Sequence, residues 1–221
     1  MHYLNHLKSI LLKEFYQERQ GKYILNSMLM FSLLLIAVVV FPFTKSDIET
    51  ETKNVLYWVI IYFSATTGLS NTFLKEAQKQ TIFHLKLIYN SYVLFLGKTI
   101  FNFIFLMFSV GIITLVYTEL FSFDFGSYTS IFVVILLTVI GISFSGTMLS
   151  ALISQVMSHG SLYVIVGFPV LFPVFLLGIN ATEFIVTTGA FPSDLVGFIV
   201  VYDIISISLS MLVFEIIWDA S

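Results

Sequence analysis

Four histidines are the side chains best suited to chemistry in this sequence, and only two of them are spaced to act together. His2 and His6 are four residues apart, a spacing that places two imidazoles on one helix face, where they could bind a metal. Both lie at the fraying start of the chain. His84 and His159 have no carboxylate or second histidine at ligand spacing. We therefore predict no metal site.

Other catalytic patterns are also missing from the sequence. It contains no phosphate-binding glycine-rich loop, no nucleophile elbow and no pair of carboxylates within an apolar stretch. It contains no cysteine, which excludes disulfides, thiolate metal sites and covalent haem attachment. We predict that the chain is not an enzyme and binds no cofactor of its own.

The composition instead indicates a membrane protein. Of the 221 residues, 58% are hydrophobic and 10% are charged, and the mean hydropathy is +0.98. Soluble domains carry about 25% charged residues, so lipid must cover this chain. A helix needs roughly 20 apolar residues to cross the hydrocarbon core. We predict an all-α integral membrane protein of one domain, residues 1–221, with no cleaved signal peptide. Its six transmembrane helices lie at about 23–43, 55–70, 92–117, 128–153, 162–181 and 196–217.

The basic residues predict the orientation of these helices. Eight of the ten precede the first stretch, lie between the second and third, or stand near the start of the third: Lys8, Lys13, Arg19, Lys22, Lys75, Lys79, Lys86 and Lys98. The loops of the opposite side hold only Lys45 and Lys53. The positive-inside rule makes the lysine-rich side cytoplasmic, so we expect both termini in the cytoplasm.

Residues 1–22 have a weaker apolar pattern. Leu4, Leu7, Leu11 and Phe15 form one stripe at helical spacing. Among the charged residues interpreted as lying off that stripe are Lys8, Lys13, Glu14 and Glu18, and Gly21 ends the helix. The pattern predicts an amphipathic helix at the membrane interface. It either contacts a cytoplasmic partner or is a passive lead-in.

The connection between the second and third stretches, residues 74–91, is the other segment with a distinctive pattern. It begins with Lys75, Glu76 and Lys79, and continues with apolar residues that include Phe83 and Leu85. Such a segment suits a short helix on the bilayer surface that offers charges and apolar side chains to another protein. The alternative is a solvated loop.

Short motifs along nearly the whole chain resemble the haem-exporter protein B family, the membrane subunit of the cytochrome c maturation ABC transporter. They are Glu14-x-x-x-Glu18-Arg19, Phe73-x-x-Glu76, Thr81-Ile82, Leu85-x-Leu87, Gly97-Lys98, Gly146-Thr147-x-Leu149-Ser150-Ala151 and Phe168-Pro169-x-x-x-Pro173. The sequence departs from the family pattern at Gln80, Tyr89 and His159, where that pattern has glycine, proline and a basic residue.

The resemblance implies an ABC-2-like permease in the bacterial cytoplasmic membrane. It implies that two copies pair with two ATPase subunits that bind Mg-ATP, beside a haem-handling membrane subunit and a periplasmic haem chaperone. ATP hydrolysis by the partner would then drive release of the haem-loaded chaperone. The resemblance implies no nucleic-acid partner. The expected ATPase-coupling surface is Glu14, Glu18, Arg19, Glu76, Lys79, Thr81, Phe83 and Leu85. A permease for a lipid-linked or peptide substrate and a structural assembly factor remain alternatives.

The predicted helices contain no obvious pair of axial ligands for haem iron. Met28 and Met30 are near one another but on different helix faces, and we interpret them as core or lipid-facing side chains.

Two prolines and one carboxylate stand out within the predicted helices. Pro169 and Pro173 each remove a backbone donor, which predicts a kink that is either a hinge or static. Asp203 should face the bundle interior, because an ionised carboxylate at membrane depth costs on the order of 2.5–3.5 kcal/mol. The Asp203 carboxylate either takes part in the passage of protons or substrate, or pairs with a polar neighbour such as Asn102 or Asn180.

Small residues recur every four positions in the fourth stretch, at Gly141/Ser145 and Gly146/Ser150. Such rows let two helices approach closely. We expect this face to be buried, either within the subunit or at the seam between two copies.

Overall fold

The computed structural model describes residues 2–21, 23–43, 49–73, 76–77, 85, 88–155 and 161–220. Over these residues the chain forms seven long α-helices and no strand, which confirms the all-helical prediction. The helices are α1 (His2–Gly21), α2 (Tyr23–Phe43), α3 (Thr50–Leu69), α6 (Ser91–Phe121), α7 (Tyr128–Gln155), α8 (Ser161–Thr188) and α9 (Ser193–Ala220).

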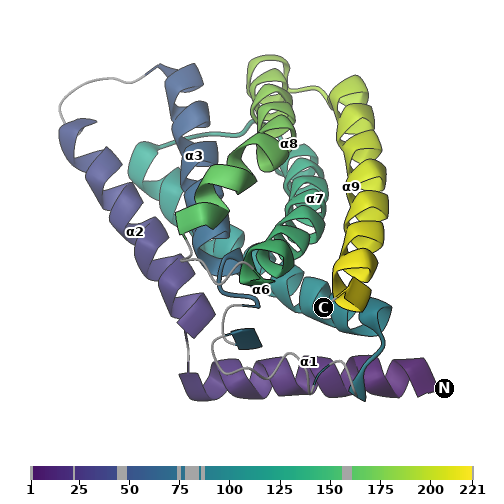
Figure 1. The fold of residues 1–221 in the computed structure, drawn as a ribbon. Helices are drawn as coiled ribbons and strands as arrows, with labels where there is room; N and C mark the ends of the chain where they lie inside the picture. Colours follow the sequence, from purple (N-terminus) through teal and green to yellow (C-terminus); the bar gives the residue numbers. More distant parts are fainter. Residues whose placement is uncertain are drawn as a thin grey trace.

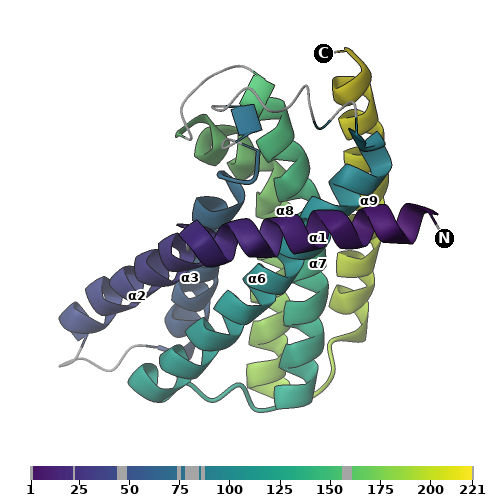
Figure 2. The ribbon, with the colours of Figure 1, turned by 90° about the horizontal axis from the view of Figure 1, so that it is seen from below.

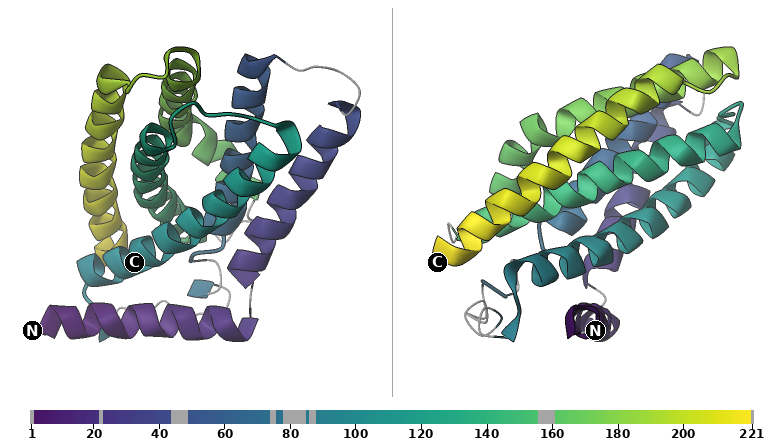
Figure 3. Two further views of the ribbon diagram at one scale, coloured as in Figure 1. Left: turned by 180° about the vertical axis from the view of Figure 1, so that it is seen from behind. Right: turned by 90° about the vertical axis from the view of Figure 1, so that its right-hand side faces the viewer.

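Helix α1 lies across one end of a bundle formed by the other helices (Figure 1). From α2 to α9, successive helices run in opposite directions, and the end of α9 returns to the same end of the molecule as α1 (Figure 3). Between α1 and α2 the chain bends by 58°. Figure 2 shows α1 running across α6, the helix against which it packs most extensively.

Four helices are long and apolar enough to cross a membrane: α6, α7, Ile165–Thr188 of α8 and Ser193–Trp218 of α9. The bent pair α1–α2 would add a fifth. Several long apolar helices of this kind are typical of a multi-pass membrane protein. Helix α3 does not meet this test in the described part of the chain, so six spans stay a prediction.

The polar residues of α3 explain this difference from the predicted six. Asn54, Ser64 and Thr66 are 1–2% exposed, because α3 packs against α2, α6 and α8. A helix covered by protein needs no continuous apolar surface. The centre of α3 is aromatic: the Tyr57 hydroxyl lies 2.7 Å from Thr114 Oγ1 on α6, and Trp58 Nε1 donates to Thr182 Oγ1 on α8. These contacts anchor the main hydrophobic core.

Candidate functional site

A buried lysine holds together three segments at the α1 end of the molecule. Lys98 lies two turns into α6 and is 1% exposed. Its ammonium group donates hydrogen bonds to Glu76 Oε1 (2.8 Å) and to the Thr72 carbonyl oxygen (2.8 Å). It also lies 3.1 Å from Glu14 Oε1 and 4.7 Å from the centre of the Phe73 ring. We call Lys98, Glu14, Glu76 and Lys13 the charge cluster; it joins α1, the segment after α3, and α6.

The local sequence allows α1 and α6 to approach closely at this point. Gly97 precedes the lysine, and a Cβ added there would lie 2.7 Å from Ile10 Cγ2 on α1. Lys13, on the rim, lies 3.6 Å from carboxylate oxygens of both Glu14 and Glu76. One turn further along α1, Glu18 Oε1 accepts a hydrogen bond from the Leu25 backbone N–H, which caps the start of α2.

The interpretation that Glu14 and Glu18 lie off the buried face of α1 is wrong. They are 7% and 5% exposed, and they continue the face of the fully buried Ile10 at intervals of four residues. Phe15, assigned to the apolar stripe, is 40% exposed, although its ring lies 5.2 Å from that of Phe101 on α6. Pairing with Lys98 and with the α2 N-terminus compensates for the burial of the two carboxylates.

Lys98 and Lys13 set the charge of Glu76. Burial alone would raise the pKa of this carboxyl, but the hydrogen-bonded Lys98 and the nearby Lys13 outweigh it, so the pKa is lowered from its ordinary value of 4.5. Glu76 is therefore ionised at neutral pH, and the charge cluster is an ion-paired network.

The lowered pKa predicts how stability depends on pH. The Glu76 contribution is fully present above pH 4.5 and is lost as the pH falls through the lower value of the folded state. We expect the wild type to unfold at a higher temperature than Glu76→Gln at pH 7, and this difference to shrink below pH 4.5. Thermal unfolding in detergent at a series of pH values measures it, and a constant difference down to the folded-state pKa would contradict the assignment.

An apolar cluster covers the charge cluster on the side of α9. Phe214 on α9 lies 5.7 Å from Phe73 and 4.9 Å from Phe95 on α6, and it stacks on Trp218 at 5.3 Å (ring centroids). Leu85, from the connection between α3 and α6, is 7% exposed in the same cluster. The end of the last helix is thus part of the unit that holds α1.

The structure describes five of the eight expected ATPase-coupling residues, and these five are either exposed or buried. Arg19 is exposed on α1, whereas Glu14, Glu18, Glu76 and Leu85 are buried within the subunit. Lys79, Thr81 and Phe83 lie outside the described residues.

The row of small residues on α7 is buried within the subunit. Gly141 faces α9, where a Cβ would overlap Asp203 Oδ1. A Cβ at Gly146 would overlap Leu69 of α3 and lie 2.7 Å from the Tyr163 hydroxyl of α8. Ser145 and Ser150 are 2% exposed, and Ser150 Oγ accepts a hydrogen bond from the Phe73 backbone N–H. The described contacts of this row are thus with helices of its own subunit.

Asp203 is 5% exposed, as expected for an interior carboxylate. The predicted pairing is wrong, because Asn102 donates to Thr72 Oγ1 (3.0 Å) and Thr147 Oγ1 (2.8 Å), and Asn180 is exposed. Asp203 Oδ1 has no hydrogen-bond partner among the described residues.

Helix α8 continues through both of its prolines, which are exposed. The Tyr202 hydroxyl of α9 donates to the Val170 carbonyl between them (2.8 Å). A hinge at Pro169 and Pro173 stays a prediction. Met28 is 2% exposed against Gly68, and Met30 is 70% exposed, so the two methionines do lie on different faces.

Neither the basic-residue pattern nor the Gly97-Lys98 motif assigned a partner to Lys98, although this lysine lies inside a largely apolar helix. A lysine at such a position needs a carboxylate partner, and that requirement was the signal that could have identified the cluster.

The model of the family described as CcmB protein matches residues 5–216. No curated protein matches the chain.

Proposed function

This chain belongs to the CcmB family, the membrane component of the haem-exporting cytochrome c maturation transporter, and from that premise we propose that it couples a separate ATPase to haem handling in that complex. In the proposal the chain is a permease subunit and the ATPase binds its α1 end, on the cytoplasmic side. ATP hydrolysis then drives release of the haem-loaded periplasmic chaperone.

The charge cluster is the observation that carries this proposal. An ATPase that moves α1 or the segment at Glu76 also moves Lys98, because both segments pair with its ammonium group. Lys98 belongs to α6, a membrane-spanning helix of 31 residues. The cluster therefore provides a rigid connection between a surface helix and a helix that crosses the bilayer.

The exposed face of α1 is the proposed contact for the ATPase. Leu12 and Tyr16 are 60% and 64% exposed, and Arg19 lies on the same side of the helix. We propose that Lys79, Thr81 and Phe83 complete this surface, while the buried Glu14 and Glu76 transmit the movement inward.

The complex contains a second copy of this chain in the proposal. The small residues of α7 already pack against α3, α8 and α9 of their own subunit, so the second copy contacts a different face. Haem is the cargo of the complex and is handled with the partner subunits.

Single cysteines test both docking and orientation, because the sequence contains none of its own. We expect Arg19→Cys to crosslink to the ATPase in the native membrane, and Thr187→Cys, exposed at the opposite end, not to crosslink. A membrane-impermeant thiol reagent added to intact cells should label Thr187→Cys alone. Labelling of Arg19→Cys from outside, or no ATPase crosslink from either Arg19→Cys or Leu12→Cys, would refute the proposal.

A further inference from the structure

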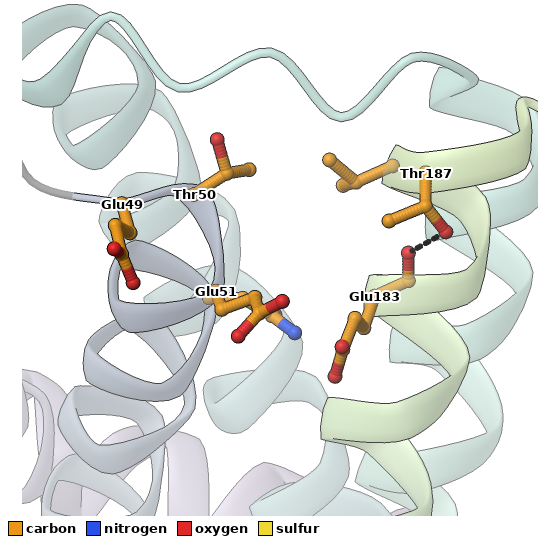
Figure 4. A pocket seen from close by; sticks show the side chains of 7 residues that line it. Glu49, Thr50, Glu51, Glu183 and Thr187 are labelled. Atoms are coloured by element: carbon orange, nitrogen blue, oxygen red, sulfur yellow. Dashed lines mark hydrogen bonds between the residues drawn. The ribbon is translucent and has the colours of Figure 1, made fainter.

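At the end opposite α1, a pocket of about 350 Å³ opens between the start of α3 and the end of α8. Glu51 on α3 and Glu183 on α8 point towards one another across it, with Glu49 and Thr187 near its rim (Figure 4). Asn54 lines it as well. The pocket has a volume that suits a small ligand or the side chain of a partner.

Asn54 is a buried amide in the wall of this pocket, and only its donor is paired. It is 2% exposed, and its Nδ2 donates to the Ile179 carbonyl on α8 at 2.9 Å, which fixes the orientation of the amide. Asn54 Oδ1 has no hydrogen-bond partner among the described residues. A buried acceptor without a donor is unfavourable, so a ligand whose N–H group reaches Oδ1 would relieve this cost.

The charges around the pocket favour a cation. Glu51 and Glu183 face one another across it, and two facing carboxylates are unfavourable unless a cation is near. Lys53 does not provide that cation, because its ammonium group donates to the Phe121 carbonyl at 3.1 Å. Anionic groups such as haem propionates are repelled.

The lining residues suit an organic cation better than a metal ion. No group of three or more acidic, histidine or cysteine residues in the described ranges is arranged to hold a metal ion. A guanidinium group instead offers five N–H donors in a plane, which can serve acceptors on α3 and α8 together. We propose that this pocket binds an arginine side chain of a partner protein on that side of the membrane. The proposal is independent of where the ATPase binds.

Trp58 can report occupancy of the pocket, because it follows Asn54 by one helical turn on α3. The chain has two tryptophans, so Trp218→Phe leaves Trp58 as the sole tryptophan, which can be excited selectively over tyrosine. The full chain in lipid nanodiscs is titrated with N-acetyl-arginine methylamide and, separately, with its neutral citrulline analogue. We expect a saturable change in Trp58 fluorescence with the arginine probe only.

Neutralising the pocket gives the decisive comparison. In Glu51→Gln/Glu183→Gln we expect binding of the arginine probe to weaken by about tenfold or more, since charge-assisted hydrogen bonds are lost. Glu119→Gln removes an exposed carboxylate of α6 outside the pocket and should bind as the parent does. Without probe, the double variant should unfold at a higher temperature than the parent, because two facing carboxylates no longer repel.

Four outcomes would overturn the proposal. These are equal responses to the arginine and citrulline probes, unchanged affinity in the double variant, and the same saturable response to Mg²⁺ or Ca²⁺ alone. The fourth is binding strengthened about tenfold by Lys45→Gln, which would make a lysine of this chain the occupant.

Discussion

Replacing Lys98 by methionine should lower the free energy of unfolding by about 3–5 kcal/mol. The substitution leaves the carboxylates of Glu14 and Glu76, 7% and 5% exposed, without their central cation. Only Lys13 on the rim, 3.6 Å from an oxygen of each carboxylate, then remains near these buried charges, and breaking a buried ion pair is far more costly than losing an exposed one. Denaturation of the purified chain in detergent micelles, followed by circular dichroism, measures the loss.

Lys8→Met is the matched control, since Lys8 is an exposed cation on α1 and its loss should change stability by no more than about 0.5 kcal/mol. Removing all three charges, with Glu14→Gln, Glu76→Gln and Lys98→Met together, should recover much of the stability lost in the single variant. If Lys98→Met were as stable as Lys8→Met, the charge cluster would not be a structural connection.

Replacing Gly178 by alanine should have the second largest effect. A Cβ at this position in α8 would lie 2.6 and 2.8 Å from two indole carbons of Trp58. The ring is rigid, and its Nε1 is held by Thr182 Oγ1, so it cannot turn aside as a flexible side chain would. Overpacking of this kind costs about 1–3 kcal/mol. Unfolding in micelles measures it, and Trp58 emission should shift at the same time.

Gly111→Ala is its control, because nothing lies within 4 Å of a Cβ added at Gly111 on α6. Alanine is favoured over glycine within a helix by about 1 kcal/mol, so this variant should be unchanged or slightly more stable. Equal stability of the two variants would show that α3 and α8 are not packed tightly at Trp58.

The sequence predicted the helices better than their contacts. Runs of apolar residues located α6 to α9 because lipid-facing and core-facing positions are both apolar. The same criterion is weak for α3, whose Asn54, Ser64 and Thr66 face protein. A one-dimensional pattern does not distinguish a helix surrounded by lipid from one surrounded by other helices.

The site was harder to predict because its parts are distant in sequence. Glu14, Glu76 and Lys98 are brought together by three separate segments, and no local periodicity relates them. Periodicity also assigned Glu14 to the solvent, because a charged residue normally lies on the polar face. Glu14 is an exception to that rule because it pairs with Lys98, a partner that the local pattern does not reveal.

The order of Glu14, Glu76 and Lys98 along the polypeptide has a consequence for biosynthesis. The ribosome delivers both acids before Lys98, so the acids lack their buried, hydrogen-bonded cation while α1 to α3 are synthesised. Insertion of α6 then neutralises them, and it closes the α1 end of the bundle in the same step. A nascent chain halted before residue 98 should therefore keep α1 undocked, whichever helices have already entered the bilayer.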